Sequence, residues 1–161
     1  MTQSEEHVRE IPEWLGCMQA WYCNQNINEM RGLESLVIEA PANLFAPCID
    51  EDKSLGIGYW LDACVRLHHH LNSVDDRDGA YAFLQFAYSK MQEMGSNISH
   101  DIEVKKWCLK RMDALIVTLL EFCQRQQSSY WERESTSLIE AHVSYMTAQN
   151  HLNLSQELAA V

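Results

Sequence analysis

The sequence predicts an all-α protein, a single-domain bundle of four to five long, mostly antiparallel helices over residues 1–161. Apolar side chains recur every three to four residues through most of the chain, which is the spacing of an amphipathic helix. The chain contains three prolines, all in its first third, and it lacks the sustained apolar–polar alternation of a half-buried strand. A chain of 161 residues is long enough to bury one sizeable core.

The first third of the chain predicts one helix and one loop. Residues 1–11 are polar and acidic, and we expect them to be flexible. Pro12 suits the first turn of a helix, and Trp14 and Trp21 then recur at helical spacing. Residues 40–53 contain two prolines and end in an acidic run, so we predict a loop there. The nearest approach to a strand, residues 35–38, is short and lies just before that loop.

The last two thirds predict helices joined by short turns. The helical segments are about 55–72, 79–94, 101–127 and 130–149, with a short terminal helix at 155–158. The turn before the second of these helices offers three candidate N-caps: Asp75, Asp76 and Asp78. Gly95 is the expected end of that helix, and Ser99 is the expected cap of the next.

Composition excludes several classes of function. The chain has 23 Asp and Glu against 12 Lys and Arg, which gives a net charge of −11. Such an acidic chain is a poor binder of nucleic acid or of an anionic membrane surface, because both are attracted by Lys and Arg. The polar start and the lack of a long apolar run give no signal peptide or membrane span, so we expect a cytoplasmic protein.

The negative charge is concentrated at one end of the chain. Residues 1–52 hold ten acids and two bases, for a charge of −8, whereas the remaining 109 residues hold 13 acids and ten bases, for −3. Seven of these acids are the candidate partner-binding residues: Glu5, Glu6, Glu10, Glu13, Asp50, Glu51 and Asp52. They predict contact with a basic surface, because complementary charge speeds association. The plainer alternative is a solvated acidic end that aids solubility.

Trp107 is a further candidate contact for a partner. It lies off the main apolar stripe of its predicted helix, among four of the chain's bases: Lys105, Lys106, Lys110 and Arg111. A tryptophan in this position either packs on a neighbouring helix or is a partly exposed anchor for another protein. The basic cluster is itself a candidate surface for the acidic first third.

A metal site is the main chemical alternative. Cys64 and His68 are four residues apart on one helix face, and His142 lies on a similar stripe, so the three with a carboxylate would make four ligands. The simpler interpretation is that both histidines lie at the edge of the core and bond to backbone or tyrosine. We find no Glu-x-x-His motif and no nucleophile elbow, and therefore expect no cofactor and no catalytic residue.

These observations predict a non-enzymatic protein that binds another protein, as a regulator, inhibitor of the immunity type, adaptor or chaperone. Its partner would carry a basic surface, and a homodimer through the apolar faces of 80–94 and 130–146 stays open as an alternative. The competing classes are a metal- or cofactor-binding bundle and a helix-turn-helix DNA regulator. The DNA-binding alternative is weakened because 79–94 carries only Lys90 as a base, although 101–127 carries four near its start.

Overall fold

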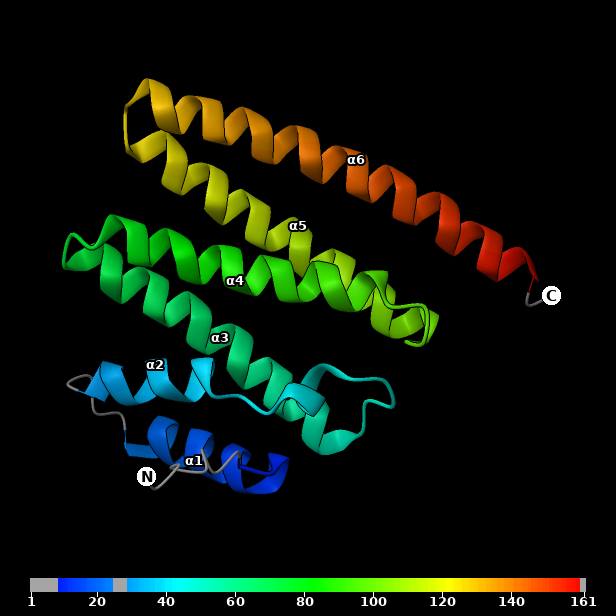
Figure 1. Cartoon of the computed structure of the whole chain (residues 1–161), viewed down its shortest axis with the longest axis horizontal. Coiled ribbons are helices and arrows are strands. Elements are labelled where there is room, and N and C mark those ends of the chain that lie inside the picture. Colours follow the sequence, from blue (N-terminus) through cyan, green and yellow to red (C-terminus); the bar gives the residue numbers. More distant parts are fainter. Residues whose placement is uncertain (1–8, 25–28, 160–161) are drawn as a thin grey trace, which may run out of the picture. The chain divides into compact units, whose positions relative to one another are not determined.

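The computed structural model describes residues 9–24 and 29–159, and this part of the chain forms six α-helices, one short 3-10 helix and no strand (Figure 1). The predicted all-helical class is confirmed, but the predicted count of four to five helices is too low. Contacts divide the chain into two compact units, residues 1–83 and 84–161. Of the segment 1–11 predicted to be flexible, residues 1–8 lie outside the described part.

The first unit contains three packed α-helices. They are α1 (Ile11–Asn24), α2 (Met30–Ile38) and α3 (Glu51–Ser73), with the 3-10 helix η2 (Ala42–Phe45) between the last two. Each of the three α-helices packs against the other two, and η2 packs against α3. The predicted helix at Pro12 is therefore confirmed, since it forms the first turn of α1.

The core of the first unit is built around two tryptophans. Trp14 and Trp60 are completely buried, and their indole N–H groups donate to the carbonyls of Leu36 at 2.8 Å and Val37 at 3.1 Å. Both carbonyls belong to the last turn of α2, where no further helical N–H is available to them. The two side chains therefore fill the core and also complete the end of α2.

A tight turn joins α3 to α4 (Arg77–Ser96). The N–H of Asp75 donates to Asn72 O and that of Asp76 to Leu71 O, while Asp75 adopts a left-handed φ of 61°. This is a Schellman arrangement, in which two otherwise unpaired carbonyls at the helix end find donors. Asp76 then accepts from Gly79 N at 3.0 Å, so the predicted aspartate cap of α4 is confirmed.

The second unit contains most of α4 together with α5 (Ile102–Arg125) and α6 (Ser129–Ala159). Figure 1 shows α5 and α6 running side by side as an antiparallel pair. Near their connecting turn, Phe122 and Trp131 meet edge to face with ring centroids 5.4 Å apart. None of the helices in the described residues is long and apolar enough to cross a membrane.

Several predicted boundaries are wrong. Helix α2 occupies residues where the sequence offered only a strand candidate, because three buried side chains rather than intrinsic propensity hold this short helix: Leu33, Leu36 and Val37. The predicted loop 40–53 contains η2 and ends early, since Asp50 caps a helix that begins at Glu51. The separate helices predicted at 130–149 and 155–158 form the single helix α6.

Two of the predicted caps are also wrong. Asp101, rather than Ser99, precedes α5 and accepts from Val104 N at 3.4 Å. Gly95 lies inside α4 instead of ending it. A Cβ atom at Gly95 would be 3.1 Å from the hydroxyl of Tyr145, so glycine here permits a close approach of α6.

Two glycines of α3 provide a matched test of the first unit's packing. A Cβ atom at Gly56 would lie 2.9 Å from Leu44 Cδ1 and 3.2 Å from Trp14 Cζ3, whereas one at Gly58 would meet nothing within 4 Å. We expect Gly58→Ala to raise the free energy of unfolding by about 0.5–1 kcal/mol, because alanine is favoured in a helix. Gly56→Ala should be less stable than Gly58→Ala by about 1–3 kcal/mol, the usual cost of overpacking. Urea denaturation measures both, and equal stability would show that this contact is loose.

Candidate functional site

The seven predicted acidic residues lie in different settings. Glu5 and Glu6 lie outside the described residues, and Glu10 and Glu13 are exposed at the start of α1. Asp50 has a structural role, because its Oδ1 accepts from Lys53 N at 2.8 Å and so caps α3. Glu51 and Asp52 are exposed in the first turn of α3, where the helix dipole favours negative charge.

The first unit also carries a surface group of aromatic side chains, which we call the aromatic cluster and which sequence reasoning missed. Its rings are half-buried and in contact: Trp21 lies 5.1 Å from Tyr22, and Tyr22 lies 5.0 Å from Tyr59 between centroids. The Tyr22 hydroxyl donates to Asp62 at 2.6 Å, and burial, followed by this bond, raises the pKa of Tyr22.

Arg66 completes the aromatic cluster. Its Nε donates to the same Asp62 oxygen at 2.6 Å, and its guanidinium carbon lies 5.1 Å from the centre of the Tyr22 ring. Asp62 and Arg66 are about half exposed, with 52% and 54% of their side-chain surfaces accessible. The spacing of four residues between them on a helix was the available sequence signal, but it does not reveal that Tyr22 from α1 lies beside them.

Trp107 lies on a groove between α5 and α6, which we call the α5–α6 groove. The groove has a volume of about 920 Å³. The α5 side chains on it recur at helical spacing and so share one face of that helix. The lining residues that matter for the chemistry of the groove come from both helices: Lys106, Trp107 and Lys110 from α5, and Met146, Asn150 and Asn153 from α6.

The basic cluster predicted at 105–111 is split by the fold. Lys105 is buried, with 3% of its surface accessible, whereas Lys106, Lys110 and Arg111 are exposed. The guanidinium carbon of Arg111 lies 5.1 Å from the Trp107 ring centre, within the range of a cation–π contact. Three of the four predicted bases therefore surround the half-buried Trp107.

A buried amide lies at one end of this groove. Asn153 is 6% exposed, and its Oδ1 has no hydrogen-bond partner among the described residues. Buried polar atoms are nearly always paired, because leaving one unpaired costs about 1–3 kcal/mol. Asn153 gives no helical or motif pattern in the sequence, so sequence reasoning could not identify it.

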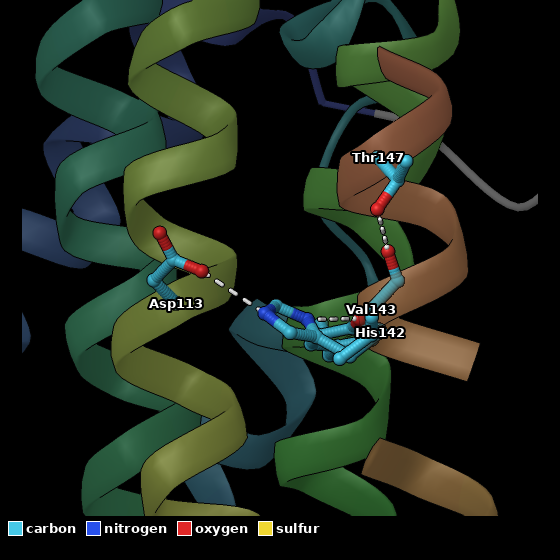
Figure 2. Close-up of polar contacts among 5 residues, drawn as sticks. Asp113, His142, Val143 and Thr147 are labelled. Carbon is cyan, nitrogen blue, oxygen red and sulfur yellow. Dashed lines mark hydrogen bonds and ion pairs between the residues drawn. The ribbon is translucent and has the colours of Figure 1, made fainter. Parts of the chain in front are cut away.

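A hydrogen-bonded chain in the second unit links three helices (Figure 2). His142 on α6 bonds through Nε2 to Asp113 on α5 at 2.9 Å and through Nδ1 to the Tyr88 hydroxyl of α4 at 2.8 Å. A carboxylate only accepts, so Nε2–H donates to Asp113 and Nδ1 accepts from Tyr88. One turn further along α6, the Thr147 hydroxyl donates to the Val143 carbonyl, which is a local helix contact (Figure 2).

This chain of bonds does not activate Tyr88 as a nucleophile. Burial, followed by the nearby Tyr145 and Asp113, raises the pKa of Tyr88 to about 12. An activated nucleophile needs a lowered pKa, whereas a raised pKa keeps the phenol protonated and able to donate. The arrangement therefore ties α4, α5 and α6 together.

The two histidines considered for a metal site have other partners. His68 is buried, and its Nδ1 bonds to Ala80 O at 2.9 Å, while His142 uses both ring nitrogens as described above. The simpler interpretation, that these histidines bond to backbone or tyrosine, is confirmed. Burial raises the pKa of the Cys64 thiol, which disfavours the thiolate that binds metal. Within the described residues, no three His, Cys, Asp or Glu side chains form a group that could hold a metal ion.

Comparison with known proteins adds no relative to these observations. No family model, curated protein or solved structure shows a significant match to this chain. The function is therefore inferred from the chemistry of the described surfaces.

The hydroxyl of Tyr88 can be tested against a matched tyrosine. Tyr88→Phe should lower the free energy of unfolding by about 0.5–1.5 kcal/mol, because the half-buried Nδ1 of His142 loses its donor. Tyr130→Phe is the control, since Tyr130 is 59% exposed. Chemical denaturation of both variants measures the difference, and equal losses would show that the bond between Tyr88 and His142 does not stabilise the fold.

The raised pKa of Tyr88 also predicts a pH dependence. Because the phenol loses its proton near pH 10 in the unfolded chain but at about 12 in the fold, the unfolded chain binds fewer protons between these values. The contribution of Tyr88 to stability is therefore complete below pH 10 and declines as the pH rises toward 12. Denaturation at several alkaline pH values should show a shallower decline for Tyr88→Phe, and an unchanged slope would contradict the assignment.

Proposed function

We propose that this protein acts by binding another protein, as a regulator, inhibitor, adaptor or chaperone. The observation that carries the proposal is the aromatic cluster on the first unit, where half-buried Trp21, Tyr22 and Tyr59 lie beside an exposed Arg66. Tryptophan, tyrosine and arginine are the side chains that most often supply the binding energy of protein interfaces.

The cluster is held in place before any partner arrives. The Tyr22 hydroxyl and Arg66 Nε both bond to Asp62, and the Trp21 indole donates to Glu29 O at 3.0 Å. Side chains that are already ordered lose less conformational entropy on binding, so more of the contact energy appears as affinity. This supports a surface used for recognition rather than aromatic residues exposed by chance.

Charge indicates the kind of partner. Residues 1–83 contain 14 acids and five bases, for a net charge of −9, whereas residues 84–161 contain nine acids and seven bases, for −2. The unit that carries the aromatic cluster therefore carries most of the negative charge. A partner with a basic surface would be attracted by this field, and its Lys or Arg side chains can stack on the accessible parts of the half-buried rings.

The proposal predicts that the rate of association with the partner depends on where the negative charges lie and not only on their number. A variant with Glu10→Gln, Glu13→Gln and Glu51→Gln should associate about threefold to tenfold more slowly with its partner at low salt, because steering by charge is weakened. The partner is first obtained by affinity capture from the native cell and identified by mass spectrometry. Stopped-flow association is then measured with the purified pair at two ionic strengths.

The control removes the same charge from the second unit. Glu121→Gln, Glu132→Gln and Glu140→Gln neutralise three exposed carboxylates there and leave the total charge equal to that of the test variant. Tyr59→Ala tests the anchor separately and should raise the dissociation rate. Equal association rates for the two charge variants would reject the acidic surface, and an unchanged dissociation rate for Tyr59→Ala would reject the aromatic cluster.

A further inference from the structure

The α5–α6 groove is a second candidate binding site, distinct in composition from the aromatic cluster. It belongs to the unit with nearly balanced charge, and it contains exposed bases beside a half-buried tryptophan. Its volume of about 920 Å³ falls within the range of pockets that bind ligands. The unpartnered Asn153 Oδ1 is an independent sign that a ligand donor belongs there.

We propose that the α5–α6 groove binds a short extended segment of a partner protein that carries a carboxylate and one large apolar side chain. The proposal concerns the second unit and does not rest on the acidic surface or on the aromatic cluster. It gives the chain a site for acidic segments in addition to the proposed site for a basic surface.

The exposed cations at the groove are the reason why we expect the ligand segment to carry a carboxylate. Lys106 and Lys110 lie one helical turn apart on the groove, and Arg111 lies over the Trp107 ring. The groove also carries two carboxylates, Glu103 and the largely exposed Asp113, which balance Lys106 and Lys110. Arg111 beside Trp107 makes the local charge positive by one, in a chain whose total charge is −11. An acidic segment would be attracted here, and a basic one repelled.

Trp107 and Met146 are the reason why we expect the ligand segment to carry a large apolar side chain. The indole offers a broad flat surface, and the unbranched thioether of methionine adapts to side chains of different shape. Both residues contribute to the groove together with Leu109, so the apolar contact is made on both helices. One large apolar residue of the ligand would cover surface that is now partly exposed to water.

The amides favour a peptide backbone over an acyl chain. Asn150 and Asn153 offer carboxamide donors and acceptors, which match the N–H and C=O groups of a peptide. An acyl chain would cover Asn153 Oδ1 without pairing it, and that state is unfavourable. The groove follows α5 from Glu103 to Asp113, about 15 Å at the helical rise per residue, so an extended segment of about four to five residues spans it.

The test is a selection from a random heptapeptide library displayed on phage, using the full-length protein. We expect the enriched peptides to share one or more carboxylates and a Leu, Phe or Trp. Fluorescence anisotropy with a synthetic copy of the strongest peptide then measures its affinity. Lys106→Glu with Lys110→Glu, and separately Trp107→Ala, should each weaken binding at least tenfold, because they remove the cations and the apolar anchor.

Matched variants separate the groove from general effects. Arg125→Glu with Arg133→Glu makes the same change of charge at exposed bases outside the groove, and Tyr130→Ala removes another exposed aromatic ring. Both should leave the peptide affinity within twofold of the original. Circular dichroism melting curves show whether each variant is folded, and Asn153→Ala provides a further variant, with an expected loss of about threefold to tenfold.

The proposal is overturned by any of three results. The first is that the selection enriches no peptide or only basic peptides. The second is that the enriched peptides bind equally well to the folded groove variants. The third is that decanoate competes for the groove and binds it more tightly than the peptide. The charge variants of the first unit, including Glu10→Gln, should leave peptide binding unchanged. Failure of the proposed basic-partner interaction can therefore be distinguished from failure of this site.

Discussion

The indole N–H groups of Trp14 and Trp60 need acceptors inside an apolar core, and both find them at the carboxyl end of α2. A helix of nine residues is too short to be stable alone in water, and its last carbonyls have no helical donors. The two requirements satisfy each other: the tryptophans pair with the end of α2, and α2 provides the surface on which they pack. Helices α1, α2 and α3 thereby become one unit, which holds the aromatic cluster in position.

The same requirement for paired polar groups organises the second unit. The imidazole of His142 has a donor on one side and an acceptor on the other, supplied by Tyr88 and Asp113, and this arrangement fixes three helices against one another. The Tyr145 hydroxyl pairs with Gln92 O and Ser96. Against this background the Oδ1 of Asn153 is informative, because buried acceptors are nearly always paired, yet this one has no partner among the described residues and belongs to a residue that lines a groove.

The sequence was sufficient where a feature is local. The periodicity of apolar residues located α1, α3, α4 and α5, and the aspartates near residue 76 indicated a cap that the structure confirms. The sequence was insufficient where tertiary packing determines whether an element forms. Helix α2 depends on tryptophans from two other helices, and Asp101 replaces Ser99 as a cap because helix boundaries are set by small energy differences. Trp107 could be singled out because it lies off the apolar stripe of its predicted helix. Tyr22, Asp62 and Asn153 depart from no such pattern.

The two surfaces are suited to different ligands because their fixed charges differ. The unit that carries the aromatic cluster has a net charge of −9, whereas the charge at the α5–α6 groove is positive by one when Arg111 beside Trp107 is included. A partner segment that matches the charge of one proposed site would be repelled by the other. Both surfaces offer aromatic rings for apolar contact, and such rings can bind many sequences with similar strength. Under the two proposals, charge would then provide the selectivity between a basic partner at one surface and an acidic segment at the other.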